Sequence, residues 1–308
     1  MFDRLRAFHR PATVAAALRL ATAERRAGGR GAFVAGGTDL VVQGDGSLRW
    51  VVDLSLLPLR YVRRRGAGGG WTIGSTTTMA DLERSAALRR FADGVLCDAA
   101  ATAGSPQIRN RGTIGGNLAN ASPACDLAPP LLALDASAVI AGGAAGARKT
   151  AGGRRTVALE RFFRGPGRPA LNGGLLVEIV IPAPPVPRGG RAAWAFQKLG
   201  RLQSDIAVVN AAAGVIVGSD CRCRWARIAI GAAGPTPLRA RRAEALLVGR
   251  PFDRDAAQAA AARAAGETRP VSDVRATADY RREMSRVLVG RALDECLERM
   301  GRDPWASW

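Results

Sequence analysis

The sequence is poor in the side chains that most enzymes use for proton transfer, nucleophilic attack and metal binding. Its 308 residues include one histidine, His9, two tyrosines, and five cysteines without a CxxC pair. A Ser-His-Asp or Cys-His system would have to use His9, which lies in an N-terminal His-Arg-Pro turn far from any nucleophile-like motif. If the protein is an enzyme, we therefore expect a cofactor to do the chemistry.

The cysteines are also too scattered for a zinc site, which needs four clustered Cys or His ligands. The Cys221-x-Cys223 pair could be a metal or redox pair, but it lies between two strand-like runs, where a turn is favoured. We predict no metal on this chain and interpret all five cysteines as reduced thiols: Cys97, Cys125, Cys221, Cys223 and Cys296.

Long apolar runs are missing as well. No stretch reaches the roughly 18 apolar residues of a membrane span, and residues 1–21 lack an apolar run that ends in a small-residue cleavage site. We expect a globular, cytoplasmic protein. With 47% hydrophobic residues and 308 residues in all, the chain should form two or three domains.

Acidic residues are outnumbered, so the net charge is +19, and only Lys149 and Lys198 of the 45 basic residues are lysine. Such a charge is compatible with nucleic-acid binding or with docking onto acidic proteins. However, the arginines are dispersed, the longest run is Arg63 to Arg65, and only 5% of residues are aromatic. Without a stacking platform or a known motif, we expect no nucleic-acid partner.

The first part of the chain alternates helix-like and strand-like segments between glycine turns, which is typical of α/β structure. The last third separates three strand-like runs from helices, including a long amphipathic helix over 278–300, which suggests an α+β domain. The boundary is placed near residue 172, and a tail covers 299–308. Helices are expected at 11–25 and from about 79 with Thr78 as N-cap, strands at 32–37, 49–55, 68–75 and 175–182, and a hairpin at 141–155.

Two glycine pairs do not fit simple core or turn patterns. AGGTDL (35–40) follows an apolar strand, and TIGGN (113–117) lies in the segment RNRGTIGGNLANASPACDLAPP. Paired glycines let backbone N–H groups converge on an anion such as a pyrophosphate, while Thr, Asn and Asp side chains bind neutral polar groups and sugar hydroxyls. Each pair alone is also compatible with an ordinary turn.

Other nucleotide signatures are absent from the sequence. There is no GxxxxGK[ST] P-loop, and the nearest approach to GxGxxG/A is GPGRPA (165–170), whose prolines preclude the required helix start. A Rossmann-type NAD site on this chain is therefore not expected.

Six segments in order resemble the FAD-binding subunit of the xanthine dehydrogenase, aldehyde oxidase and carbon monoxide dehydrogenase family. The resemblance spans roughly residues 5–295, and several motifs in the right order are far more specific than one glycine pair. The segments are AGGTDL, TIGSTTTMADLE, SPQIRNRGTIGGNLANASPACDLAPPLLALDA, FQKLGRLQSDIAVVNAA, IAIGAAGPTPLRARRAEALLVG and DVRATADYRREM.

This resemblance implies an FAD-carrying electron-transfer subunit of a heterotrimeric molybdenum hydroxylase. A large partner subunit would carry molybdopterin, a small one two [2Fe–2S] clusters, and electrons would leave through noncovalent FAD to NAD+, a quinone or dioxygen. The implied fold is α+β: a vanillyl-alcohol-oxidase-type (PCMH-like) FAD-binding domain of two α/β subdomains at 1–172, then a C-terminal domain with a three-stranded antiparallel sheet and helices at 173–298.

The resemblance also implies which residues bind FAD. The two glycine loops are expected to supply backbone N–H groups to the pyrophosphate, and polar residues further on to reach other parts of the cofactor. The full set is Ala35, Gly36, Gly37, Thr38, Asp39 and Leu40, then Thr113, Ile114, Gly115, Gly116 and Asn117, then Asn120, Asp126, Leu175, Leu176 and Lys198. Purely structural roles remain open for several of these residues, such as core packing for the two leucines and turn capping for Asp126.

Three features of the sequence bear on the electron acceptor, on iron–sulfur clusters and on the attachment of FAD. Relatives of the carbon monoxide dehydrogenase type tend to carry an aromatic residue where this chain has Ile206, so we predict NAD+ as acceptor, with a quinone or dioxygen as alternatives. Residues 118–175 contain only Cys125 and no cysteine-rich insertion, so no iron–sulfur cluster is expected here. His9 precedes both loops in a turn typical of the family's start, which favours noncovalent FAD.

Two alternatives remain at this stage. A stand-alone FAD oxidase of the vanillyl-alcohol type would need a substrate cap with catalytic Tyr, His or Arg groups, and the chain offers only Tyr61, Tyr280 and His9 of the first two kinds. A binding module that keeps an FAD fold without turnover is the second.

Overall fold

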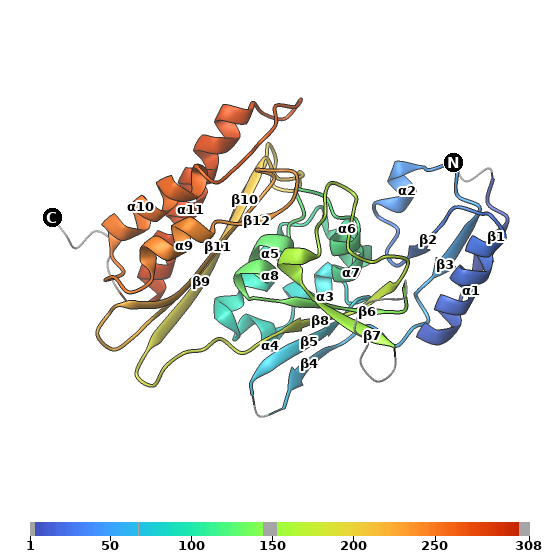
Figure 1. The fold of residues 1–308 in the computed structure, drawn as a ribbon, viewed down its shortest axis with the longest axis horizontal. Coiled ribbons are helices and arrows are strands. Elements are labelled where there is room, and N and C mark those ends of the chain that lie inside the picture. Colours follow the sequence, from blue (N-terminus) through green and yellow to red (C-terminus); the bar gives the residue numbers. More distant parts are fainter. Residues whose placement is uncertain (1–3, 67, 144–152, 302–308) are drawn as a thin grey trace.

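The computed structural model describes residues 4–66, 68–143 and 153–301. Three sheets follow one another across the molecule, with the N-terminal sheet at one end and the C-terminal helices at the other (Figure 1). The predicted hairpin at 141–155 and the predicted tail at 299–308 fall largely outside the described residues.

The N-terminal subdomain is a small parallel sheet with strand order β1-β3-β2, as an α/β pattern requires. Helix α1 begins after Thr13, whose side chain accepts a hydrogen bond from the Ala16 N–H, and it packs its alanine face on the sheet. The elements are β1 (Ala7–His9), α1 (Val14–Arg26), β2 (Gly31–Val34), α2 (Leu40–Gln43) and β3 (Trp50–Asp53).

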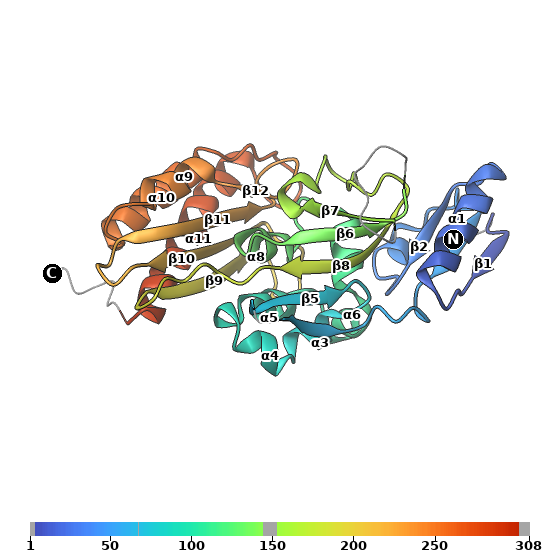
Figure 2. The same ribbon diagram turned by 60° about the horizontal axis from the view of Figure 1, so that its bottom comes forward.

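The second subdomain is a five-stranded sheet with order β4-β5-β8-β6-β7 and a layer of short helices on one face (Figure 2). Its neighbouring strands all pair antiparallel, so this subdomain is α+β and not the α/β unit that the resemblance implies. Thr78 caps α3 in a capping box with Asp81, which confirms the predicted helix start. The strands are β4 (Val62–Arg65), β5 (Gly70–Gly74), β6 (Ser137–Ala141), β7 (Arg154–Ala158) and β8 (Leu175–Ile181), and the α-helices are α3 (Met79–Glu83), α4 (Ala86–Arg89), α5 (Val95–Ala101), α6 (Pro106–Arg111), α7 (Ile114–Ala119) and α8 (Ala128–Ala133).

The boundary near residue 172 is wrong, because β8 pairs with β5 and β6 in the sheet of the second subdomain. The strand itself was predicted, but its partners lie about 40 and 100 residues earlier in the chain, and local sequence does not reveal such pairing. The N-terminal unit therefore extends through Ile181, and the proline-rich segment 182–190 connects it to the C-terminal domain.

The C-terminal domain has a four-stranded antiparallel sheet, order β12-β11-β10-β9, where three strands were predicted. The additional strand, β12, spans two residues, too few to leave a periodic pattern in the sequence. Its helices cover one face of the sheet, and the other face packs on α5 and α8. The elements are β9 (Arg191–Leu199), β10 (Val209–Val217), β11 (Cys223–Gly231), β12 (Leu238–Arg239), α9 (Arg241–Leu247), α10 (Arg254–Ala265) and α11 (Ala278–Arg299), the last confirming the predicted long helix.

Candidate functional site

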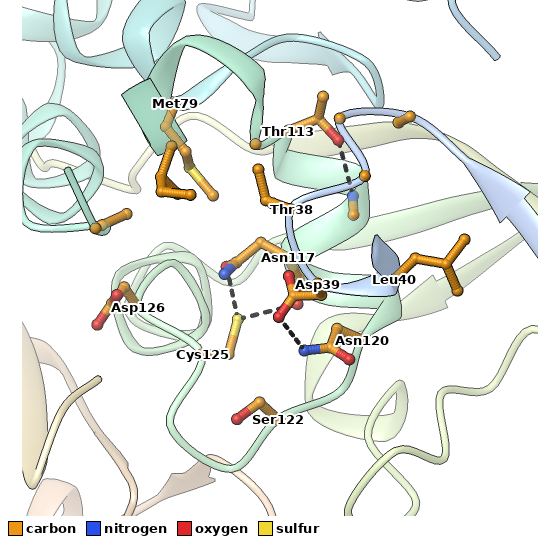
Figure 3. Close-up of a pocket in the computed structure, with 18 of the residues that line it drawn as sticks. Thr38, Asp39, Leu40, Met79, Thr113, Asn117, Asn120, Ser122, Cys125 and Asp126 are labelled. Carbon is orange, nitrogen blue, oxygen red and sulfur yellow. Dashed lines mark hydrogen bonds between the residues drawn. The ribbon is translucent and has the colours of Figure 1, made fainter. Parts of the chain in front are cut away.

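A cavity of about 400 Å³ opens where the two N-terminal subdomains meet the C-terminal domain. The loop after β2 and the segment around α7 contribute to its lining (Figure 3). The loop between β9 and β10 contributes residues 204–206. Residues far apart in the sequence therefore converge on one space, and both predicted glycine motifs are among them. The lining comprises residues 33–40, 43, 79, 103–104, 108, 112–113, 116–117, 119–120, 122, 124–126 and 204–206.

The first glycine loop, residues 35–39, leaves β2 and turns into α2 beside the cavity. Gly37 has φ +75°, a left-handed conformation that side chains disfavour. A Cβ on Gly36 would lie 1.9 Å from the carbonyl oxygen of Arg111, so this glycine lets the loop approach the end of α6, just before the second glycine loop.

The backbone N–H groups of this loop are available to a ligand. Within the described part of the chain, the N–H groups of residues 36–40 have no hydrogen-bond partner, although Val41 and Gln43 bond back to Gly37 and Asp39. Successive N–H groups in a turn that includes a left-handed residue form a concave anion site. The loop can therefore bind a phosphate or pyrophosphate.

In the second glycine loop, residues 113–117, most backbone N–H groups already have partners within the chain. Thr113 caps α7, because its Oγ1 accepts from the Gly116 N–H at 3.0 Å, while the N–H groups of Ile114 and Gly115 donate to the Thr77 and Ser75 carbonyls. Most N–H groups that the resemblance assigns to the pyrophosphate here are thus already bonded. Ile114 and Gly115 are buried away from the cavity, and Thr113, Gly116 and Asn117 line it.

Small polar side chains occupy the cavity wall beside α2. Asn120 Nδ2 donates to Asp39 Oδ1 at 3.0 Å, and Gln43 Nε2 donates to Asn120 Oδ1 at 3.2 Å. Burial raises the pKa of the Asp39 carboxyl above its usual value. Together with Thr38, which lines the same wall, these groups offer both donors and acceptors to hydroxyl groups of a ligand.

Asp126 lies at another part of the wall and forms a buried ion pair with Lys198 of β9. Lys198 Nζ is 3.0 Å from Asp126 Oδ1 and donates to the Thr102 carbonyl at 2.8 Å; the two side chains are 5% and 12% exposed. Burial raises the pKa of the Asp126 carboxyl, and the opposing effects of Lys198 and of Asn210 only partly offset it. Lys198 does not line the cavity and contacts it only through Asp126.

Cys125 lines the cavity and is buried. Its Sγ lies 2.8 Å from Asn117 Oδ1, and the Leu127 N–H also donates to this amide oxygen. Burial raises the pKa of the Cys125 thiol, so the group stays protonated and unreactive near neutral pH.

Two other predicted residues lie elsewhere. Leu175 and Leu176 belong to β8 and are buried in two different hydrophobic clusters, and neither lines the cavity. Ile206 does line the cavity, from the loop between β9 and β10, and is 55% exposed.

Sequence reasoning missed several residues at the site. Met79 and Ile108 supply apolar lining, and Gln43 and Asn210 hold the predicted polar residues in place. Met79 and Ile108 carry no signal distinct from ordinary core residues. Across the described residues, no group of three or more His, Cys, Asp or Glu side chains could hold a metal ion, and no helix is long and apolar enough to cross a membrane.

The donor set suits a dinucleotide. The N–H row of residues 36–40 suits a pyrophosphate, the amides and carboxyls suit sugar hydroxyls, and the open face of Gly116 leaves room for close approach. A Cβ there would contact only Thr113 Oγ1, at 3.1 Å. The residues present therefore fit FAD.

Two protein-family models match successive parts of the chain. Residues 2–184 match the FAD binding domain in molybdopterin dehydrogenase, and residues 194–296 match the CO dehydrogenase flavoprotein C-terminal domain. The gap between the two matches, residues 185–193, overlaps the proline-rich segment 182–190 and the start of β9.

Relatives agree with these matches. The carbon monoxide dehydrogenase medium chain of Hydrogenophaga pseudoflava is 34% identical over 246 residues, covering 79% of this chain and 80% of that one. The xanthine dehydrogenase FAD-binding subunit of Escherichia coli O157:H7 is 29% identical over 312 residues, covering 98% and 99%. A solved structure of the Hydrogenophaga pseudoflava carbon monoxide dehydrogenase superimposes with a TM-score of 0.85 at 32% identity, over 97% of this chain and 100% of that chain.

Proposed function

The chain belongs to the family of FAD-binding subunits of molybdopterin dehydrogenases, and on that premise we propose that it transfers electrons inside a heterotrimeric molybdenum hydroxylase. Electrons would arrive from the [2Fe–2S] clusters of a small partner subunit, which a molybdopterin-bearing large subunit reduces. They would leave through FAD on this chain to NAD+ or another acceptor. Hydroxylation itself would take place on the large subunit.

One observation carries this proposal: residues 36–40, whose N–H groups have no partner among the residues that the structure describes, line a cavity that Thr113, Gly116 and Asn117 of the second glycine loop also line. FAD, when bound, supplies the ability to accept electrons singly from clusters and to release them as a pair. This chain's residues hold the cofactor in place and limit its exposure to water. The N–H row fixes the pyrophosphate, and the Asp39–Asn120 pair binds hydroxyl groups.

The electron acceptor is proposed from the residue at the cavity edge. Ile206 lies in the loop between β9 and β10, and it is an exposed aliphatic side chain with room to move aside for a nicotinamide ring. An aromatic side chain at this position would cover a flavin ring more tightly. We therefore favour NAD+ over a quinone or dioxygen.

Copurification tests the subunit role. A tagged chain expressed from its native host should bring down one molybdopterin subunit and one [2Fe–2S] subunit, and acid precipitation should leave FAD in the supernatant. A single yellow protein that oxidises alcohols without partners would instead support a stand-alone oxidase. A coloured acid pellet would contradict noncovalent binding.

Rapid-reaction kinetics test the acceptor. The purified complex is reduced with dithionite, mixed with NAD+, a water-soluble quinone or dioxygen, and followed by flavin absorbance. We expect NAD+ to reoxidise the flavin fastest, and Ile206→Phe to slow this reaction more than the reaction with dioxygen. A variant that slows all three acceptors equally, or a complex indifferent to NAD+, would contradict the assignment of the acceptor.

A further inference from the structure

One part of the cavity wall has little regular structure of its own. Residues 122–126 run between α7 and α8 with few local bonds, and four of them line the cavity. Cys125 Sγ bonds to Asn117 of α7, and the C-terminal domain supplies further bonds. The Ala232 N–H donates to the Pro123 carbonyl at 2.7 Å, and Asn210 and Lys198 both donate to Asp126.

Asn210 is the most enclosed of these donors. It is 0% exposed on β10, where it is the cross-strand partner of Lys198 on β9. Its Nδ2 donates to Asp126 Oδ1 at 3.2 Å and lies 3.4 Å from the Cys125 carbonyl. Because both neighbours are acceptors, the amide must present its nitrogen to the cavity wall.

The Asn210 side chain occupies a space that a glycine on the neighbouring strand leaves open. A Cβ on Gly231 of β11 would lie 2.1 Å from Asn210 Oδ1, so the amide fills room that only glycine leaves free. In the described part of the chain, Asn210 Oδ1 has no hydrogen-bond partner. Burying an oxygen without a hydrogen-bond partner costs free energy. The bonds that the same side chain donates to Cys125 and Asp126 offset part of this cost.

We infer that Asn210 is a positioning residue for FAD: it fixes the Asp126 carboxylate and the 122–126 segment on the cavity wall. Lys198 neutralises this carboxylate but carries no directional constraint of its own, since an ammonium group rotates freely. Lys198 Nζ lies 3.0 Å from Asp126 Oδ1 and 3.1 Å from Oδ2, whereas the planar amide donates to Oδ1 and so sets the orientation of the carboxylate. The C-terminal domain thereby contributes to FAD affinity without contacting the cofactor through this residue. This inference rests on the proposed function, because it takes FAD as the ligand.

The test compares FAD affinity with stability in the full chain. Deflavinated protein is titrated with FAD by flavin fluorescence, and thermal unfolding is recorded without FAD. Asn210→Ala should raise the dissociation constant about tenfold or more, the factor that corresponds to 1.4 kcal/mol. Val289→Ala, a fully buried change in the C-terminal core away from 122–126, is the matched control and should lower the melting temperature while leaving FAD affinity within about twofold. Asn210→Ser repeats the comparison with a smaller change in packing.

A charge exchange separates positioning from stability. In Asp126→Asn combined with Asn210→Asp, the new carboxylate lies beside Lys198 in register, so an ion pair and an amide–carboxylate bond can form again. The melting temperature should recover toward the wild-type value, and FAD affinity should stay low because the carboxylate has left the wall. Recovery of affinity with stability, or an equal loss in Val289→Ala, would overturn the inference. A wild-type chain that binds no FAD would refute the proposed function, whereas tight binding by both wild type and Asn210→Ala would overturn this inference alone.

Discussion

Two neighbouring glycines of the second loop should respond in opposite ways to the same substitution. A Cβ on Gly115 would lie 2.5 Å from the Ser75 carbonyl oxygen and 2.6 Å from the Ser75 Cβ, inside a closed contact between α7 and the segment after β5. A Cβ on Gly116 would meet only Thr113 Oγ1, at 3.1 Å, and Gly116 lines the cavity.

The magnitudes follow from these contacts. Gly115→Ala forces backbone to shift, and such overpacking costs about 1–3 kcal/mol, or about 2–12 °C in melting temperature for a domain of this size. Gly116→Ala gains up to about 1 kcal/mol of helix propensity, which offsets the tight contact with Thr113. We therefore expect the FAD-free stability of this variant to stay within about 1 kcal/mol of wild type.

Gly116→Ala, the variant with the smaller loss of stability, should show the larger loss of FAD affinity. Gly116 lines the cavity in which we propose that FAD binds, so a methyl group in Gly116→Ala should obstruct the cofactor and raise the dissociation constant about tenfold or more. Thermal unfolding without FAD and fluorescence titration with FAD, on both variants, check the pair. The reasoning is refuted if Gly116→Ala binds FAD as tightly as wild type, or if Gly115→Ala is as stable as wild type.

Three further predictions concern the surrounding charges and caps. Lys198→Met leaves the buried Asp126 carboxylate without its cation and should lower the free energy of unfolding by about 3–5 kcal/mol. The control Arg282→Met breaks an exposed pair with Asp279 and should lower it by less than about 1 kcal/mol. Urea titration measures both losses, and equal losses would contradict the stabilising role of the buried pair. Asp39 has a folded-state pKa above its unfolded value of 3.8, so its contribution to stability is most favourable below that value and is lost as pH rises through the folded pKa. The stability of wild type relative to Asp39→Asn should therefore fall as the pH rises above about 4, and a difference that is flat or rises there would show that burial does not raise this pKa. Thr78→Ala removes the capping box of α3 and should cost about 1 kcal/mol; an unchanged urea midpoint would contradict that role.

Local signals in the sequence predicted much of the fold. The Thr78 cap, the long C-terminal helix and the strand that became β8 each depend on residues within one segment, so pattern and capping chemistry suffice. The two glycine loops were found for the same reason, because close backbone approach requires residues without side chains.

Long-range pairing was not accessible in the same way. The membership of β8 in the second sheet depends on partners far away in the chain, and the pairing of Lys198 with Asp126 joins two domains. The resemblance named Lys198 as a group near FAD but could not show that its ammonium is bonded to Asp126 and Thr102. In the sequence, Asn210 is one polar residue in an alanine-rich strand, and its bond to Asp126 is visible only in the structure.

The assignment of the first glycine loop to the FAD pyrophosphate is tested most directly by amide hydrogen exchange across residues 36–40. These N–H groups have no partner within the described chain, so they should exchange rapidly in the deflavinated protein. Saturation with FAD should slow their exchange by about tenfold or more, together with that of Thr113. Protection elsewhere in the cavity with no change at residues 36–40 would contradict the account.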